Sequence, residues 1–480
     1  MRKQKILLLL IIVLLSLNNS HAQGTNTDTL LTLQKCVDIA IKNNLQVKQS
    51  ELTSQSSKVS YRQAIENMLP SFSASANQGL SYGRTISSVN NGYIDQQTDN
   101  GSYSLNGSII LFSGLQLQNA IRQNSYAYDA SKMDWQQQKD NITLQVILDY
   151  LQVLSNEDLL AITREQASTD SQSVARAEIQ NKEGAIAPST LTDLQGQYAG
   201  DLVNIATAIN ALETSKINLY NLLNIPYDRT VRYERIAMDV QLPVYPANSD
   251  SIFRTALQII PAIKSADLRV KQYEKALKVA RGAYWPTLYF NGSVGTTYSS
   301  LATNTFEGLP YINDTTINYV STNTGDYSVI EKNPTVTSSN ISWGDQFKNN
   351  RGTSLGLSLQ IPILNSFRAR NNVKLAKINL ENYKYTASAT KLQLQQMVEQ
   401  AYQNMISAYG QYKSYEDQVA AYTQSFRSAD IRFQAGVITS VDYLVVKNSY
   451  DRANTSLIAA RYNYIFRMKI LDYYQGRLTW

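Results

Sequence analysis

The chain is an internal duplication. Identical residues recur at one offset of 216 and, further along, at a second offset of 252: Ala40 with Ala256, Pro70 with Pro286, Gly184 with Gly436 and Tyr198 with Tyr450. Because the two offsets differ by 36, the second copy contains one loop that is 36 residues longer than its counterpart. A duplicated unit of this size favours a symmetric, elongated architecture over a compact enzyme with a pocket.

The N-terminus has the pattern of a secretory signal peptide. Basic residues at Arg2, Lys3 and Lys5 precede the apolar run Ile6–Leu17, and a small-residue cleavage site follows at Ala22. The run is shorter than the roughly 20 residues needed to span a bilayer, so a retained anchor is the weaker interpretation. We therefore expect residues 1–22 to be removed and the exported protein to lack a transmembrane helix.

The composition excludes several classes of function. Removal of residues 1–22 takes away three basic residues and no acidic one, which lowers the formal charge from +6 to +3. No run of Lys and Arg is long enough to indicate nucleic-acid binding. The single histidine, His21, lies in the predicted signal peptide, and Cys36 is the single cysteine. Without a histidine, a second cysteine or a glycine-rich phosphate loop, we expect neither an enzyme nor a bound cofactor or metal, and Cys36 is expected to be a half-buried helix residue.

Four segments alternate between apolar and small polar residues, two in each copy. They are Ser71–Arg84, Ser102–Phe112, Thr287–Tyr298 and Ser354–Ile361. This pattern is typical of membrane β-strands with lipid on one face and water on the other. A soluble sandwich also alternates, but these segments are long and nothing else in the chain is expected to supply a second sheet. Since barrels need about eight strands or more, four strands per chain predict a barrel shared between subunits.

Two proline-free segments predict very long helices. Leu115–Lys182 and Phe367–Ala435 would each extend about 100 Å at 1.5 Å per residue. The second contains two interleaved heptad rows, which indicate coiled-coil packing. The rows are Leu394, Ala401, Ala408, Tyr415, Tyr422 and Ala429, and Val398, Met405, Tyr412, Val419, Phe426 and Phe433.

Each long helix is flanked by further helices. Helices are predicted before the strands at Leu33–Met68 and Ser251–Tyr284, and after glycine turns at Ala185–Leu223 and Val437–Tyr474. The predicted division is therefore a first repeat at 23–223, a proline-containing linker at 224–248 and a second repeat at 249–480. The longer loop of the second repeat, near Ser299–Asn350, is expected to be an exposed polar loop.

The order and spacing of these features resemble those of the TolC-like outer-membrane efflux proteins, also called outer membrane factors. The resemblance covers essentially the whole exported chain and is carried by Leu33–Ala40, Ile110–Gly114, Arg432–Gly436, Asp442–Leu444 and Ala460–Tyr464. It implies a mixed α and β membrane protein: a homotrimer with four transmembrane strands per chain, a shared 12-stranded barrel and a helical periplasmic tunnel. It also implies the outer membrane of a Gram-negative bacterium, contact with its lipid, and partnership with a periplasmic adaptor and an inner-membrane transporter. The implied role is a passive exit duct of a tripartite efflux or type I secretion system.

The same resemblance places the periplasmic entrance of the tunnel at the second glycine turn. Asp442 matches an acidic position that forms a ring around this entrance in some members, although an exposed aspartate favouring a helix start is an equal alternative. A second acidic position is Val445 here, and an aromatic–basic pair is replaced by Phe433 and Ile438. These residues favour an apolar constriction over a salt-bridged latch. Thr190 is the counterpart of Asp442 in the first repeat, so a ring would contain one carboxylate per subunit.

A second class of function stays open on the helices alone. Long heptad helices would also suit a periplasmic coiled-coil scaffold or adaptor protein without a pore. The four amphipathic strands favour the duct, because an adaptor has no need of a lipid-facing band.

Overall fold

The computed structural model describes residues 30–86, 92–235 and 242–477, which fall into two compact units. The helical unit comprises the residues up to Ser56, Tyr128–Leu268 and the residues from Lys384 onward. The sheet unit comprises Ser57–Ala127 and Arg269–Tyr383. The predicted signal peptide at 1–22 lies outside the described residues.

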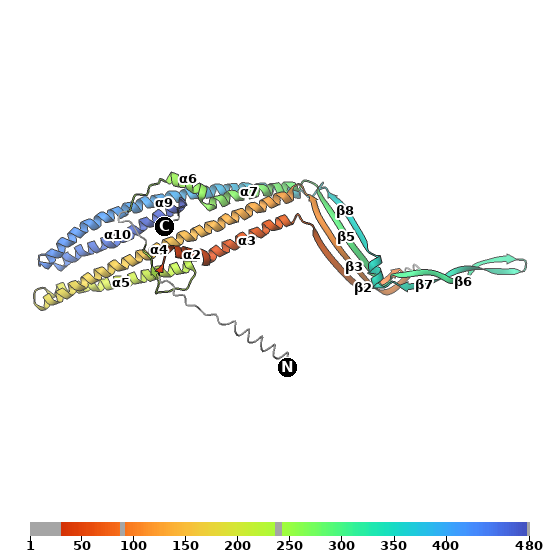
Figure 1. Ribbon diagram of the computed structural model, residues 1–480, viewed down its shortest axis with the longest axis horizontal. Helices are drawn as coiled ribbons and strands as arrows, with labels where there is room; N and C mark the ends of the chain where they lie inside the picture. The colour runs from red at the N-terminus through yellow and green to blue at the C-terminus, as the bar shows by residue number, and fades with distance from the viewer. Residues whose placement is uncertain (1–29, 87–91, 236–241, 478–480) are drawn as a thin grey trace, which may run out of the picture. The chain divides into compact units, whose positions relative to one another are not determined.

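The elements of the two halves follow one another in the same order (Figure 1). The first half contains α2 (Leu33–Asn43), α3 (Leu45–Glu66), β2 (Ser71–Ile86), β3 (Tyr93–Phe112), α4 (Gln116–Lys182) and α5 (Pro188–Leu223). The second contains α6 (Ser249–Ile259), α7 (Pro261–Gly282), β5 (Thr287–Ser299), β8 (Gly352–Gln360), α9 (Arg368–Gln434) and α10 (Ser440–Tyr474). The starts of α2, α3 and β2 recur at the offset of 216, and those of α4 and α5 at 252. The division at residues 224–248 stays a prediction.

The sheet unit contains a four-stranded antiparallel sheet in the order β2-β3-β5-β8. Its register confirms the alternation predicted from the sequence. On one face serines pair across strands, with hydroxyl oxygens 3.0 Å apart for Ser71 and Ser108 and 2.8 Å apart for Ser293 and Ser354. The sheet therefore has one continuous face of small polar side chains.

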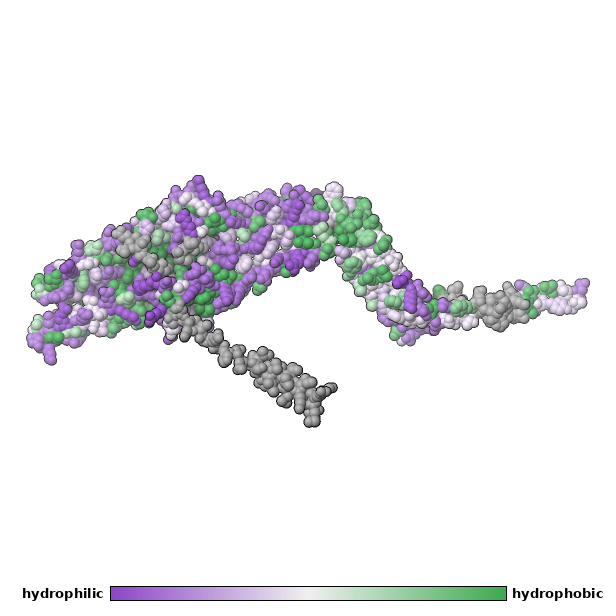
Figure 2. Space-filling model, in the orientation of Figure 1, coloured by the Kyte–Doolittle hydropathy of each residue, from purple (hydrophilic) through white to green (hydrophobic). Residues whose placement is uncertain are grey.

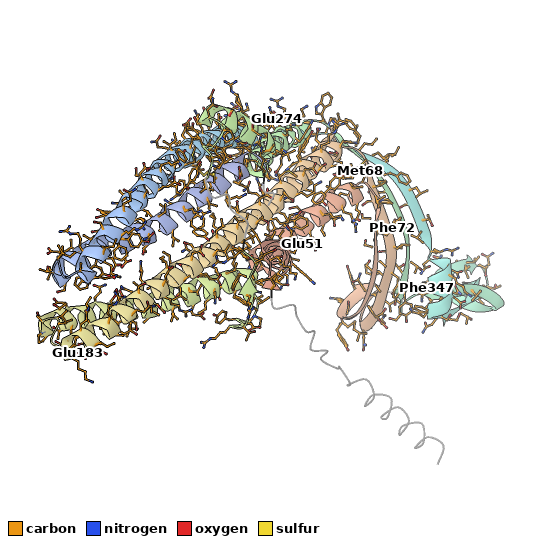
Figure 3. All side chains as sticks on the ribbon, turned by 60° about the vertical axis from the view of Figure 1, so that its left-hand side comes forward. Glu51, Met68, Phe72, Glu183, Glu274 and Phe347 are labelled. Carbon is orange, nitrogen blue, oxygen red and sulfur yellow. The ribbon has the colours of Figure 1, made fainter. Side chains whose placement is uncertain are left out.

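The opposite face of this sheet is apolar and exposed. Leu105 lies opposite Val294 and Phe290 opposite Leu357 in the register. Phe72, on the outer strand β2 and labelled in Figure 3, is 72% exposed, and Leu355 on the other outer strand is 73% exposed. Apolar residues gather over these strands in Figure 2. A face of this kind exceeds the scattered apolar exposure expected of a soluble surface.

The prediction that nothing else in the chain forms a sheet is wrong. Where a polar loop was expected, β6 (Thr303–Thr322) and β7 (Gly325–Asn340) form a separate two-stranded hairpin. Threonine, valine, isoleucine and tyrosine recur through this segment, and these residues favour extended backbone even when polar. A further short pair joins β1 (Leu30–Leu31) to β4 (Arg232–Tyr233) in the helical unit. The short helix α8 (Trp343–Asn349) connects β7 to β8.

Each helix predicted before the strands is in fact two helices. Asn44 ends α2 in an extended conformation, and its side-chain oxygen accepts from the backbone N–H of Gln46 at 2.9 Å. Asparagine thus caps the next helix, which its short polar side chain favours over continuing the first. In the second half Ile260 is extended before Pro261, as the residue preceding a proline tends to be.

The heptad rows predicted on α9 are confirmed. Leu394, Val398, Ala401, Met405, Ala408 and Tyr412 are buried, and the rest of both rows is buried or half-buried. Within the helical unit, α4 runs beside α5 and α9 beside α10 (Figure 1). Val146, Val153 and Leu160 of α4 join the same apolar core. Among the described residues, no helix has the length and apolar character needed to cross a membrane.

Candidate functional site

The two glycine turns of the helical unit have the same backbone geometry. Gly184 and Gly436 are left-handed, with φ of 71° and 70°. After α4, Ala185 N donates to Gln180 O at 2.8 Å, and after α9, Val437 N donates to Arg432 O at 2.8 Å. This is the Schellman ending that glycine permits, and it reverses the chain into α5 and α10. Figure 3 labels Glu183 in the first turn.

The two helices that follow these turns start differently. Thr439 caps α10: its Oγ1 accepts from Asp442 N at 3.1 Å and donates to Asp442 Oδ2 at 2.8 Å. The counterpart of Thr439 is Ala187, which makes no side-chain cap, and α5 instead begins with Pro188. Thr190 occupies the same first-turn position as Asp442 but brings no charge. The Asp442 carboxylate therefore stabilises a helix start and stays exposed.

An apolar cluster joins the two turns. Tyr443 is buried and stacks on Phe433 with ring centroids 4.5 Å apart. Ile438 and Phe433 pack against the same buried group, which contains Val174 and Leu194 of the first half. On the polar side of this contact, Ser440 Oγ donates to Asp193 Oδ2 at 2.9 Å.

A groove of about 1030 Å³ lies between the turns. Its lining includes three of the predicted site residues, Thr190, Phe433 and Ile438, but neither Asp442 nor Val445. The five residues therefore divide into two sets. Three of them face the contact between the turns, and the other two lie on the exposed side of α10.

Asp442 and Val445 lie in an exposed, largely apolar strip. Val441 and Val445 of α10 are each at least 60% exposed, as is Val437 in the turn before the helix. Residues four apart share one face of a helix, so Val441 and Val445 form one ridge, and Asp442 follows Val441 at its edge. This strip therefore combines exposed apolar surface with one exposed carboxylate.

A buried ionic group lies further along the same helices and was not predicted. Lys447 of α10 is 1% exposed, with its Nζ 2.9 Å from Asp170 Oδ2 of α4. Asp451, one turn along α10, pairs with the same lysine, and Asp201 of α5 is buried alongside. The Lys447 and Asp451 spacing of four is a sequence signal for an ion pair, but nothing in the sequence indicates its burial.

Metal ligands do not cluster in the described part of the chain, and its cysteine is buried. It contains no group of three or more histidine, cysteine or acidic side chains arranged to hold a metal ion. Cys36 is fully buried rather than half-buried, and burial raises the pKa of its thiol to about 12. A thiol in this state is unreactive, which limits Cys36 to packing.

The fold is shared with solved outer-membrane channels. A solved Campylobacter jejuni CmeC outer membrane channel superposes with a TM-score of 0.74 at 16% identity, covering 93% of this chain and 86% of that one. Vibrio cholerae VceC superposes at 0.72 with 12% identity, covering 93% and 97%. Neisseria gonorrhoeae MtrE superposes at 0.65 with 18% identity, covering 93% and 88%.

Sequence comparison identifies the family itself. The model of the outer membrane efflux proteins matches residues 36–224 and 252–466, and the chain belongs to that family. It is 22% identical over 336 residues to the outer membrane protein TolC of Escherichia coli, covering 69% of this chain and 60% of TolC. It is 24% identical over 328 residues to the toxin and drug export protein A of Aggregatibacter actinomycetemcomitans, covering 63% and 66%. The chain thus spans less than two thirds of the length of these curated relatives.

The family fixes the location of the protein. It is an outer-membrane protein of a Gram-negative bacterium, with a large periplasmic portion. This agrees with the location that the sequence predicted.

Proposed function

We propose that the protein is a passive exit duct of a tripartite efflux or type I secretion system, working as a homotrimer. The observation that carries this proposal is the four-stranded sheet, which has an exposed apolar face, a serine-lined face and two outer strands, β2 and β8. In a bilayer the apolar face would contact lipid and the serine face would line water.

The edges of the sheet require further strands. Unpaired backbone groups in a bilayer cost several kcal/mol each, so β2 and β8 must be paired there. Since the four strands are antiparallel throughout, β8 and β2 run in opposite directions. Strand β8 of one subunit can thus pair antiparallel with β2 of the next, and three copies give the 12-stranded barrel that the family resemblance implied.

The helices next to these edge strands have exposed apolar rows. Along α9, Ile378, Tyr385, Leu392 and Ile406 are exposed and lie on one heptad register, which also includes Glu399. At 100° per residue, this row lies about 130° around the helix from the buried seam. A helix with two seams at this angle is suited to a ring, with one neighbour on each side.

A matching row runs along α3. Leu45, Leu52 and Val59 are exposed at heptad spacing. Helix α3 ends at Glu66 just before β2, and α9 starts at Arg368 just after β8. Each outer strand is therefore continued by a helix with an unpartnered apolar row. This supports a head-to-tail interface in which α9 and β8 of one subunit meet α3 and β2 of the next, an arrangement that closes into a ring.

The exposed strip at the start of α10 supports a narrow entrance at the glycine turns. In the proposed trimer, Val441 and Val445 would form an apolar constriction, and Asp442 would add one carboxylate per subunit. Phe433, Ile438 and Thr190 would support this constriction without lining it, because they face the groove between the turns. A carboxylate ring would favour cations over anions.

The substrates would be delivered by partners. We propose a periplasmic adaptor at the turns and an inner-membrane transporter below it, since a passive duct needs an energised source. A coiled-coil scaffold without a pore would explain the helices equally well, but it gives no role to the exposed apolar face of the sheet.

The test combines assembly and conductance. Detergent-purified protein should be trimeric by light scattering and should form channels in planar bilayers. Leu392→Lys should dissociate the trimer and abolish channels by placing a charge in the exposed α9 row. Gln393→Lys, one residue along and about 100° around the helix, is the matched control and should leave both unchanged. A protein that is soluble without detergent and forms no channels would refute the duct.

A further inference from the structure

The buried ionic group lies between the two helical hairpins of one subunit. It joins α4 and α5 of the first half to α10 of the second. Four side chains make it up: Asp170, Asp201, Lys447 and Asp451. Asp170 and Lys447 are each 1% exposed and Asp201 is 5% exposed.

The charges of this group do not balance. Three carboxylates surround one ammonium, so with all four ionised the group would have a net charge of −2 in a buried site. Uncompensated buried charge is strongly unfavourable, and a carboxyl group commonly avoids it by taking up a proton.

The hydrogen bonds point to the position of that proton. In the part of the chain that the structure describes, no donor with good geometry reaches Asp170 Oδ1 or Asp201 Oδ2. Asp201 Oδ1 accepts from Gln197 Nε2 at 3.3 Å. Two ionised carboxylates only accept, so Asp170 and Asp201 can hydrogen-bond each other only if one of them is protonated.

The pKa shifts of Asp170 and Lys447 also favour a bound proton in this group. The pKa of Asp170 is raised to about 7, chiefly by burial and then by the hydrogen bond to Asp201, although Lys447 lowers it. Burial lowers the pKa of Lys447, but the hydrogen bond and charge of Asp451, followed by those of Asp170, outweigh this and raise it overall.

Tyr443, on the same helix as Lys447, also lies near the site. Its pKa is raised, chiefly by burial and then by the charge of Asp430 on α9, and its charge also interacts with Lys447 and Asp170.

We propose that the buried Asp170 carboxyl holds a proton that faces Asp201, and that this pair with Lys447 and Asp451 is a pH-sensitive lock between the two helical hairpins of a subunit. While the proton is bound, Asp170 links Asp201 on one side to Lys447 on the other. When it is lost, two carboxylates repel each other in a buried site and the contact between α10 and the α4–α5 hairpin weakens.

The direction of the pH dependence follows from linkage. The closed lock holds a proton that separated, hydrated carboxyls would release near pH 4. The lock is therefore tightest below about pH 4, weakens as the pH rises toward 7, and changes little above 7. Weakening of the lock would loosen the turns at the proposed entrance, and this consequence rests on the proposed function. The lock itself does not depend on the proposed function.

Hydrogen–deuterium exchange of the full-length protein in detergent tests the lock directly. Peptides from 440–455 and 190–205 should show local opening that increases up to about tenfold per pH unit between pH 5 and 7, after correction for intrinsic exchange rates. Asp170→Asn keeps the shape of the side chain and replaces the acidic proton by an amide donor. Local opening in this variant should therefore not vary with pH. Asp201→Asn should behave in the same way, which provides a second variant if the first does not fold.

Asp193→Asn is the matched control. Asp193 is an exposed carboxylate that bonds Ser440 across the same pair of hairpins, so this variant should keep the pH dependence of the natural protein. Equal opening at pH 5 and 7 in the natural protein would overturn the lock, as would an unchanged pH dependence in both amide variants. Opening that responds to sodium rather than to pH would show a bound cation in place of the proton. Hydrogen–deuterium exchange does not require the protein to form a channel. A result against the proposed duct would therefore be seen in the conductance experiment and not in this one.

Discussion

Thr439 and Asp442 form two hydrogen bonds with each other across the first turn of α10. The Thr439 hydroxyl accepts from the Asp442 backbone at 3.1 Å and donates to the Asp442 carboxylate at 2.8 Å. This geometry is compatible with both interpretations of Asp442 that the sequence raised. Its carboxylate accepts from the capping Thr439 hydroxyl, and it remains exposed next to Val441 and Val445. The role of Asp442 in a charge ring stays a prediction.

The two roles of Asp442 can be separated by mutation. Asp442→Asn removes the charge and should reduce the preference for cations in bilayer conductance, because the proposed ring would lose its three carboxylates. Thr439→Ala keeps the charge and removes the cap, which should cost about 1 kcal/mol of stability with little change in selectivity. Reversal potentials in a salt gradient measure the first effect, and chemical denaturation measures the second. Unchanged selectivity in Asp442→Asn would remove Asp442 from the conduction path.

The valine strip predicts the resting conductance. Replacing both Val441 and Val445 by threonine keeps the size of the side chains similar but allows water to wet the surface. Channels of this variant should show a higher resting conductance, because an apolar constriction blocks ions by excluding water. The same double change at Val203 and Leu202, exposed apolar residues of α5, serves as the control and should leave the conductance as it was. A resting conductance equal to that of the natural protein would place the constriction elsewhere.

The start of α4 depends on a close approach of two glycines. Gly114 has a φ of 60°, and a Cβ there would lie 2.6 Å from the backbone oxygen of Gly282. Gly114→Ala should therefore destabilise the protein by about 1–3 kcal/mol through strain and a backbone clash. Gly410 is the control: it lies inside α9 with nothing within 4 Å of its added Cβ, so Gly410→Ala should stabilise by up to about 1 kcal/mol. Thermal melting followed by circular dichroism compares the two, and equal melting temperatures would contradict the close approach.

Cys36 should report unfolding. Its side chain is fully buried and burial raises its pKa to about 12, so at pH 8 almost no thiolate is present or accessible. A maleimide added to the folded protein should label it at least a hundred times more slowly than in urea, on the order expected from thiolate fraction and access. Intact-mass spectrometry follows the adduct. Rapid, complete labelling of the folded protein would show that this part of the core opens readily.

The sequence predicted the elements that repeat strongly and missed those set by single side chains. Many residues repeat the same pattern in the heptad rows on α9 and in the alternation along β2, β3, β5 and β8. One exceptional residue does not obscure such a pattern, so these elements are predicted well. The breaks at Asn44 and Ile260 depend on one residue each, within otherwise continuous helical patterns. The sequence does not predict the β6–β7 hairpin, because its polar residues are equally typical of an exposed loop.

The candidate site was only partly predictable. Family resemblance located Phe433, Ile438 and Asp442 at one turn, but it gave no indication of which of them face the groove and which face outward. The Thr439 cap has a recognisable spacing of three. The group around Lys447 does not, because Asp170 and Asp201 come from distant parts of the chain and meet only in the folded bundle.

Cryo-electron microscopy of the detergent-purified protein would show the proposed assembly itself. We predict three copies around one axis, with β8 of each paired antiparallel to β2 of the next in a closed 12-stranded barrel, and with α9 against the neighbour's α3. A monomer with β2 and β8 unpaired, or a ring joined through other strands, would contradict it.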